Sequence, residues 1–156
     1  MSDLSERHHK LVATLWVHEG IFGAAVNLLI SGGSLFLLLW FTSFGDAAVS
    51  DLPGRWLVFA VPVVLIGFAA GALSTLYRFG RPMTIFAALS GSLMGFLAGI
   101  LLLGFLQTSG STDYEGYPVI RYAAWVASAM IVVGAVTALA AILLAWLIRK
   151  VSSGGK

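Results

Sequence analysis

The chain alternates between four long apolar stretches and short polar segments. The apolar stretches run approximately over residues 11–41, 56–77, 83–106 and 119–148. Each is longer than the roughly 20 residues that a helix needs to cross the hydrocarbon core of a bilayer. Polar residues within them are too sparse for the surface helices of a soluble protein. The pattern therefore predicts an all-α integral membrane protein, built as a four-helix transmembrane antiparallel bundle.

The composition agrees with this prediction. Hydrophobic residues make up 59% of the 156 residues and charged residues only 10%, whereas soluble domains carry about 25% charged residues. The connections are too short for a second domain, so we expect residues 1–156 to form a single transmembrane domain. The first apolar stretch far exceeds the roughly 7–15 residues of a signal-peptide core, so we expect this helix to be retained.

The cations of the short polar segments predict an orientation. Arg7 and Lys10 precede the first stretch, Arg78 and Arg81 lie in the second connection, and Arg149 follows the fourth stretch. Cytoplasmic segments of membrane proteins are enriched in Lys and Arg, so we expect the N- and C-termini to be cytoplasmic. The excess of Arg over Lys, with abundant Ala and Gly, favours a multi-pass protein of a prokaryotic cell membrane.

Glycine and proline predict where helices end or bend. Gly80 suits the C-terminus of one helix and Pro82 the first turn of the next, so the second and third stretches should form a tight antiparallel hairpin. Pro62 lies about two turns into the second stretch. It should bend that helix and release one backbone carbonyl.

Small residues recur at four-residue spacing in two of the stretches. These are Gly67 and Gly71 in the second, and Gly91, Gly95 and Gly99 in the third. Ridges of this kind allow two membrane helices to approach closely. We predict that they are helix-packing positions, mainly within the bundle, with contact to another copy as the alternative.

Glu19 is the ionisable residue that lies most clearly inside a stretch. It follows Trp16 by three positions, which places it near the cytoplasmic interface, where the cost of a charge is reduced. We predict a structural ion pair between Glu19 and Arg78, with Arg81 as the less favoured partner. A proton or cation site at Glu19 is the alternative.

A small and polar face follows Glu19 along the same helix. It includes Asn27 and Ser31. An amide at this depth can hydrogen-bond to a neighbouring helix, which we favour over ion coordination because a coordination site needs several oxygens. His18 lies about 100° around the helix from Glu19, and a haem would need a second histidine from another copy. We favour an interfacial histidine and expect no cofactor.

Other chemistries lack the residues that they require. The chain has no cysteine, no paired carboxylates in the spans and no basic stripe with aromatic residues, so neither thiol chemistry nor nucleic-acid binding is predicted. Tyr114 and Tyr117, with Asp113 and Glu115, could form a recognition patch, although an ordinary outer loop has the same composition. The resemblance between 30–35 and 89–93 is too short to favour an internal duplication.

Close-packing glycines are thus plentiful, whereas chemically competent groups are scarce. We predict a small polytopic membrane protein of structural or accessory type, more in keeping with a non-enzyme, that contacts membrane lipids and works within a larger membrane assembly or a homo-oligomer. The alternative is a small channel or transporter whose pathway is lined by Glu19, Asn27, Ser31 and Ser34. A lipid-modifying enzyme that uses Glu19, His18 and Arg78 ranks third.

Overall fold

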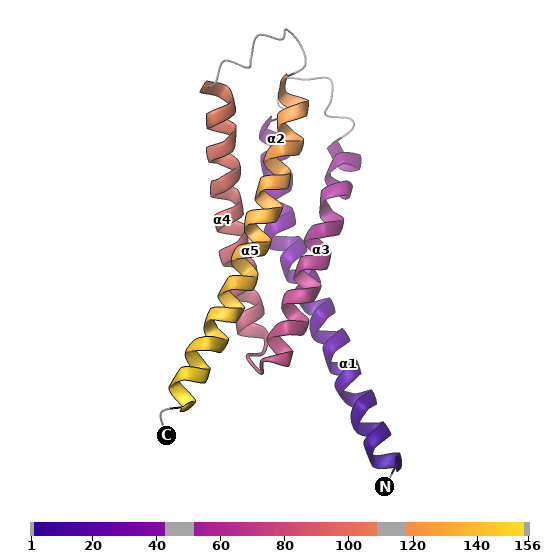
Figure 1. Cartoon of the computed structure of the whole chain (residues 1–156). Helices are drawn as coiled ribbons and strands as arrows, with labels where there is room; N and C mark the ends of the chain where they lie inside the picture. Colours follow the sequence, from indigo (N-terminus) through magenta and orange to yellow (C-terminus); the bar gives the residue numbers. More distant parts are fainter. Residues whose placement is uncertain (1, 43–51, 109–117, 155–156) are drawn as a thin grey trace.

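The structure is a computed structural model that consists of helices over the part of the chain it describes. The backbone is described for residues 2–42, 52–108 and 118–154, and side chains for 12–38, 40, 56–106 and 124–153. The helices are α1 (Ser2–Asn27), the π-helical turn η1 (Leu28–Gly32), α2 (Gly33–Thr42), α3 (Leu52–Leu76), α4 (Arg81–Thr108) and α5 (Pro118–Gly154). Figure 1 shows that α1, η1 and α2 follow one another as one long rod.

Four helical rods are long and apolar enough to cross a membrane. Their apolar spans are Val12–Leu38, Trp56–Leu76, Arg81–Leu106 and Ala124–Ser153. Neighbouring rods run in opposite directions and pack as a bundle (Figure 1). The predicted four-helix bundle is confirmed. Both ends of the chain lie at the same end of the bundle as the connection between α3 and α4; the cytoplasmic location of that end stays a prediction.

The connection between α3 and α4 is a tight turn. The amide N–H of Arg78 donates to the carbonyl of Thr75 at 3.0 Å, and that of Phe79 to the carbonyl of Ser74 at 2.8 Å. This pair of bonds is the Schellman arrangement that closes a helix C-terminus. The residue that turns the chain out of the helix is Arg78, with a φ of 58°. A bulky side chain therefore stands in the left-handed conformation where glycine is usual.

The predicted hairpin is present, with one difference in its chemistry. Gly80 also has a positive φ, of 70°, but it follows the helix end by several residues and leads into α4. Pro82 is the second residue of α4. Backbone N–H groups in the first turn of a helix have no acceptor within the helix, so the missing N–H of proline costs no hydrogen bond there.

The bundle is composed of two closely packed helix pairs, α1 with α3 and α4 with α5. In the first pair, a Cβ added to Gly67 would lie 2.5 Å from the Cβ of Asn27, and one added to Gly71 would meet the backbone carbonyl of Glu19. Gly23 on α1 faces both glycines of α3. Only glycine allows these backbones to come so close.

The second pair repeats this design with other glycines. A Cβ on Gly91 would lie 2.6 Å from the carbonyl oxygen of Gly134, and one on Gly95 would lie 2.5 Å from that of Met130. At Gly99 a Cβ would lie 2.7 Å from Cγ of Met130. All five glycines singled out in the sequence therefore lie at helix crossings inside this chain.

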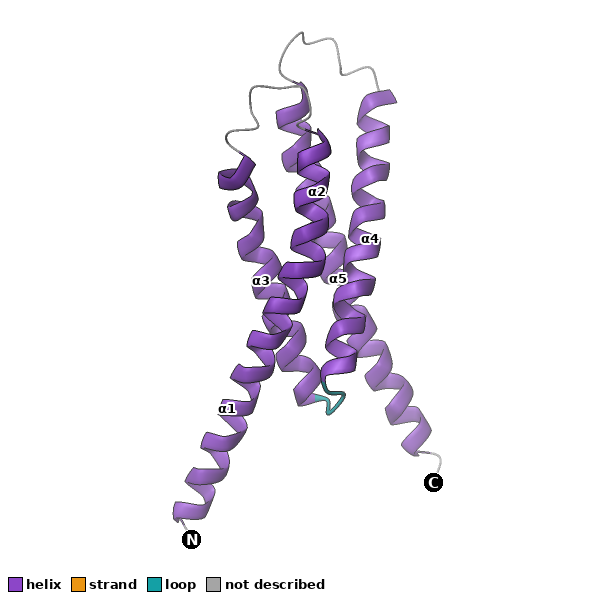
Figure 2. Ribbon diagram, turned by 180° about the vertical axis from the view of Figure 1, so that it is seen from behind, coloured by secondary structure: helices purple, strands orange, loops and turns teal. Residues whose placement is uncertain are grey.

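The two terminal helices extend past the bundle and diverge at the end where the chain begins and finishes (Figures 1 and 2). α5 has 37 residues, which at about 1.5 Å per residue is roughly 55 Å, well beyond a hydrocarbon core of about 30 Å. Every side chain from Val12 to His18 on α1 is exposed. The large apolar side chains among them, Val12, Leu15, Trp16 and Val17, are 38–57% exposed.

Candidate functional site

The first span is interrupted near its middle by the π-helical turn η1. Asn27 immediately precedes the turn, and the turn ends at Gly32. A π-helical insertion widens the helix and leaves carbonyls without their usual partners, and such insertions are frequent at functional sites. In a membrane these carbonyls need other donors, because no solvent is present to satisfy them.

Side chains add donors at two carbonyls of this turn, of which that of Ile30 also accepts from the backbone N–H of Gly33. The indole Nε1 of Trp56, at the start of the second span, donates to the carbonyl of Gly32 at 3.0 Å. The hydroxyl of Ser34 donates to the carbonyl of Ile30 at 2.8 Å. The π-turn is therefore held from α3 as well as from its own helix.

Asn27 lies at the centre of the polar contacts and is only 7% exposed. Its Nδ2 donates to the carbonyl of Val63 on α3 at 2.7 Å, and its Oδ1 accepts from the hydroxyl of Ser31 at 2.8 Å. Val63 directly follows Pro62 in the chain. Pro62 deprives the carbonyl of Val58, four residues earlier, of its helical donor. Asn27 therefore binds a different carbonyl from the one that the proline releases. The predicted hydrogen bond from Asn27 to a neighbouring helix is present.

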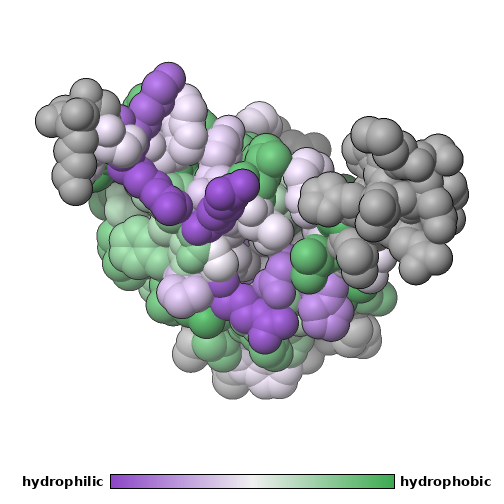
Figure 3. Space-filling model, turned by 90° about the horizontal axis from the view of Figure 1, so that it is seen from below, coloured by the Kyte–Doolittle hydropathy of each residue, from purple (hydrophilic) through white to green (hydrophobic). Residues whose placement is uncertain are grey.

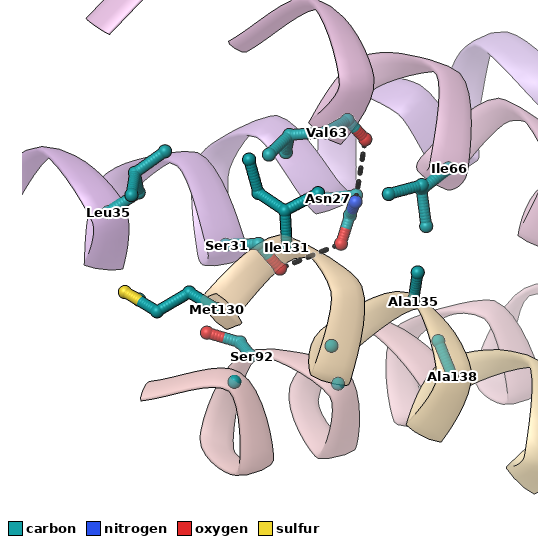
Figure 4. A pocket seen from close by; sticks show the side chains of 13 residues that line it. Asn27, Ser31, Leu35, Val63, Ile66, Ser92, Met130, Ile131, Ala135 and Ala138 are labelled. Atoms are coloured by element: carbon teal, nitrogen blue, oxygen red, sulfur yellow. Dashed lines mark hydrogen bonds between the residues drawn. The ribbon is translucent and has the colours of Figure 1, made fainter. Parts of the chain in front are cut away.

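A second polar contact links the same segment to the other helix pair. The hydroxyl oxygens of Ser34 and Ser92 lie 3.0 Å apart, which joins α2 to α4. Figure 4 shows Asn27 and Ser31 facing each other from one rod, with Ser92 across the space from them. We call Asn27, Ser31, Ser34 and Ser92 the central polar cluster.

A cavity lies between the central polar cluster and α5. The volume open to the centres of water-sized spheres is about 30 Å³, and Asn27, Ser31 and Ser92 contribute its polar lining. Met130, Ile131 and Ala135 of α5 line the other side (Figure 4). One water needs roughly 10–15 Å³ by this measure, so the cavity has room for about two. A primary amide has two N–H donors and an oxygen with two lone pairs. The contacts with Val63 and Ser31 use one of each, so the amide of Asn27 can still hydrogen-bond to water in the cavity.

The ionisable residue of the first span forms an ion pair at the end of the bundle where the termini lie. The guanidinium of Arg81 approaches Glu19 with Nη2 3.1 Å from Oε1 and Nε 3.2 Å from each carboxylate oxygen. The Glu19 side chain is 19% exposed and that of Arg81 is 52% exposed. The same guanidinium stacks 4.8 Å above the ring of Phe22.

The predicted partner of Glu19 was therefore wrong. Arg78 is the residue that turns the chain out of α3, and its side chain lines a hollow beside α5. The chain reverses direction over the next residues, so Arg81, at the start of α4, comes to lie beside α1. Because the choice depended on how the turn is built, depth in the membrane alone favoured the wrong arginine.

The other sequence candidates are not gathered into one site. His18 is exposed and lines a shallow hollow on α1 with Val17 and Ile21, away from Arg78. The set proposed for lipid chemistry is thus not assembled in the described structure. The outer-loop patch, residues 113–117, lies outside the described residues. Within the described part of the chain, no three His, Asp or Glu residues are close enough to hold a metal ion.

Several polar features were not recognised in the sequence. The run Ser31-Gly32-Gly33-Ser34 could have signalled a weak point in the helix, because glycine lowers helix propensity, but nothing in it specified a π-turn. Ser74 is fully buried, and its hydroxyl has no hydrogen-bond partner among the described residues.

The comparisons of this chain with protein-family models, curated proteins and solved structures found no match. The central polar cluster can hold helices together and solvate a small polar species, and the Glu19–Arg81 pair can join α1 to the hairpin.

Proposed function

We propose that the protein is a structural or accessory subunit of a larger membrane assembly, and that it contacts this assembly through the exposed turns of α1. The observation that carries this proposal is the exposure of every side chain between Val12 and His18, inside the apolar span Val12–Leu38. These turns lie beyond the Glu19–Arg81 ion pair, at the end of the bundle where α1 diverges from the other helices (Figure 2).

The side chains of this segment are of the kind that contact another membrane helix. A shallow hollow on its surface is lined by small, β-branched and polar residues that include Ala13, Val17 and His18. Membrane helix contacts are enriched in small residues and in side chains that hydrogen-bond across the interface.

The distribution of polar groups supports the same role. The amide of Asn27 and the carboxylate of Glu19 both bind groups of this chain, and so do Ser34 and Ser92. These contacts connect α1 and α2 to α3 and α4. Polar groups inside a membrane that serve catalysis or transport usually face a substrate path, whereas these act as ties between helices.

The glycines favour a different chain over a second copy as partner. Gly67, Gly71, Gly91 and Gly95 are occupied by contacts inside the chain. The ridges that could have driven self-association are therefore already used.

The test is cross-linking in the native membrane. A photo-crosslinking amino acid at Val17, which is 52% exposed, is compared with the same amino acid at Leu93, which is 61% exposed on α4. We expect Val17 to give one adduct with a larger membrane protein, found in fixed ratio by native mass spectrometry of the extracted material. Ala13→Leu should abolish this adduct. Adducts of two identical chains, or equal labelling at both positions, would contradict the proposal.

The cavity favours a second candidate, a small channel or transporter. The observation behind it is the central polar cluster beside a space for about two waters, at a π-helical turn near the middle of the first span. The pathway would follow the polar face of the rod formed by α1, η1 and α2, past Glu19, Asn27, Ser31 and Ser34. Liposome flux that Asn27→Leu abolishes and Ser90→Ala leaves intact would favour this function, because the hydrogen bond described for the Ser90 hydroxyl is to Ala87 of its own helix.

A further inference from the structure

A basic groove lies between the end of α3 and the last turns of α5. Its volume is about 300 Å³, and its lining includes Tyr77, Arg78, Trp146, Arg149, Lys150 and Ser153. Three of these residues are cationic and none is acidic. Figure 3 views the molecule from this end and shows hydrophilic side chains gathered among apolar ones.

The cations are fixed by contacts that leave their charge uncompensated. Arg149 Nη1 donates to the backbone carbonyl of Arg78 at 3.3 Å, a carbonyl at the negative end of the α3 dipole. The Arg149 guanidinium also lies 5.8 Å from the centre of the Phe79 ring, and Lys150 Nζ lies 5.1 Å from that of Trp146. Among the described side chains, no carboxylate pairs with these cations, since Glu19 is bound to Arg81.

Aromatic residues place the groove at the edge of the membrane. The rings of Tyr77 and Trp146 lie 5.7 Å apart, and Tyr77 directly follows the apolar span that ends at Leu76. Tyr and Trp concentrate at the depth of lipid headgroups because one side of each ring system is apolar and the other can hydrogen-bond. We therefore expect the three cations to lie at the depth of the lipid phosphates.

We propose that this groove binds the phosphate of an anionic phospholipid headgroup. Arg149 and Arg78 would contact the phosphate oxygens as fork-shaped donors, and Lys150 would add a point charge. Basic pockets between membrane helices on the cytoplasmic side are a known solution for holding anionic lipids.

The surroundings favour a lipid over a soluble phosphate. Leu76, which lines the groove, is 47% exposed, and on α5 Leu147 and Ile148 are 48% and 62% exposed. An acyl chain that leaves the headgroup can run along this apolar surface, whereas a free phosphate gains nothing from it. A ligand that matches both the positive charge and the apolar surface is an anionic phospholipid.

The experiment uses the full-length protein in nanodiscs that contain phosphatidylglycerol and phosphatidylcholine with identical acyl chains. Native mass spectrometry then counts the lipids that remain bound after release. We expect a strong preference for phosphatidylglycerol in the wild type. Each cation near an anionic surface contributes about 1 kcal/mol, which corresponds to about fivefold in affinity, so Arg149→Gln combined with Lys150→Gln should weaken retention roughly 25-fold.

Two further variants separate binding from folding. Arg78→Gly removes a groove cation while placing the favoured residue at the left-handed position, so it should lose about fivefold in lipid retention from a protein at least as stable as the wild type. Arg81→Gln removes a cation at the same end of the bundle but outside the groove, and should retain lipid as the wild type does.

The result that would overturn the proposal is equal retention of phosphatidylglycerol by the wild type and the groove variants, or no preference over phosphatidylcholine. A separate titration of inorganic phosphate into protein in phosphatidylcholine nanodiscs tests the other source of phosphate. We expect no saturable binding there. Saturable binding of inorganic phosphate, without any preference for phosphatidylglycerol, would overturn the lipid assignment and would mean that the groove binds a soluble phosphate.

Discussion

Arg81 at the start of α4 holds Glu19 of α1 with its Nε 3.2 Å from both carboxylate oxygens. The two residues are 62 positions apart in the chain. Their contact joins the first helix to the α3–α4 hairpin at the end of the bundle where α1 begins to diverge (Figure 2). It is the last described tie between α1 and the hairpin before the exposed turns of α1.

Exchanging the two charges should test this contact. Glu19→Arg and Arg81→Glu should each lower the free energy of unfolding by about 0.5–1 kcal/mol, since the pair is partly exposed, and the double variant should recover most of the loss. Unfolding in mixed micelles measures the effect. The matched control is Glu19→Arg with Arg78→Glu, which should show no recovery; recovery there instead would mean that Arg78 is the partner after all.

Adding one methyl group at the α1–α3 crossing should destabilise the bundle. Gly71→Ala would push a Cβ against the backbone carbonyl of Glu19, and overpacking of this kind costs about 1–3 kcal/mol. Gly104→Ala is the control, because no described atom outside its chain neighbours and the backbone of its own helix lies within 4 Å of a Cβ at that position. Denaturation of both variants in bicelles should show a loss only for Gly71→Ala. Equal stability of the two would mean that the helices do not cross so closely.

Removing the amide of Asn27 should weaken the attachment of α1 to α3. Asn27→Leu loses the bonds to Val63 and Ser31, at a cost of about 0.6–2 kcal/mol. A double-mutant cycle with Ser31→Ala should give a coupling energy above about 0.5 kcal/mol, because the two side chains bond directly. Additive losses would argue that the Asn27–Ser31 bond contributes nothing to stability.

The indole of Trp56 should stabilise the π-helical turn. Trp56→Phe keeps an aromatic ring beside Phe36, whose ring centre lies 6.2 Å from that of Trp56, but removes the indole that donates to the Gly32 carbonyl. The loss of one hydrogen bond costs about 0.5–1.5 kcal/mol. Amide hydrogen exchange should rise in residues 28–33 for this variant. Trp125→Phe, at a position 70% exposed, should leave that exchange unchanged.

The turn after α3 offers a stabilising substitution. Arg78 has a φ of 58°, and a non-glycine residue in this conformation costs about 1–2 kcal/mol. Arg78→Gly should raise the free energy of unfolding by about 1 kcal/mol. Arg78→Ala, which removes the same charge but keeps a Cβ, should give no such gain. A gain for alanine as large as that for glycine would place the cause in the charge.

The sequence by itself determined the fold class. Four apolar stretches leave no other arrangement, because backbone groups in lipid must be satisfied within each segment and only helices of this length achieve that here. The sequence also identified Gly67, Gly71, Gly91 and Gly95 as positions of close approach, since their spacing keeps them on one helix face. The glycine and proline of residues 80 and 82 indicated the hairpin, because glycine tolerates the positive φ of a turn and the fixed φ of proline suits the first turn of a helix.

Only the tertiary structure decided which groups meet. Glu19 pairs with Arg81 and not with Arg78, because the Schellman turn at the end of α3 directs one arginine towards α5 and the next towards α1. The π-turn after Asn27 depends on donors from Trp56 and Ser34, and the former comes from another helix. Hydrophobic periodicity specifies which residues enter the membrane, but contacts between distant segments depend on helix rotation, on helix crossing and on a few residues in a turn.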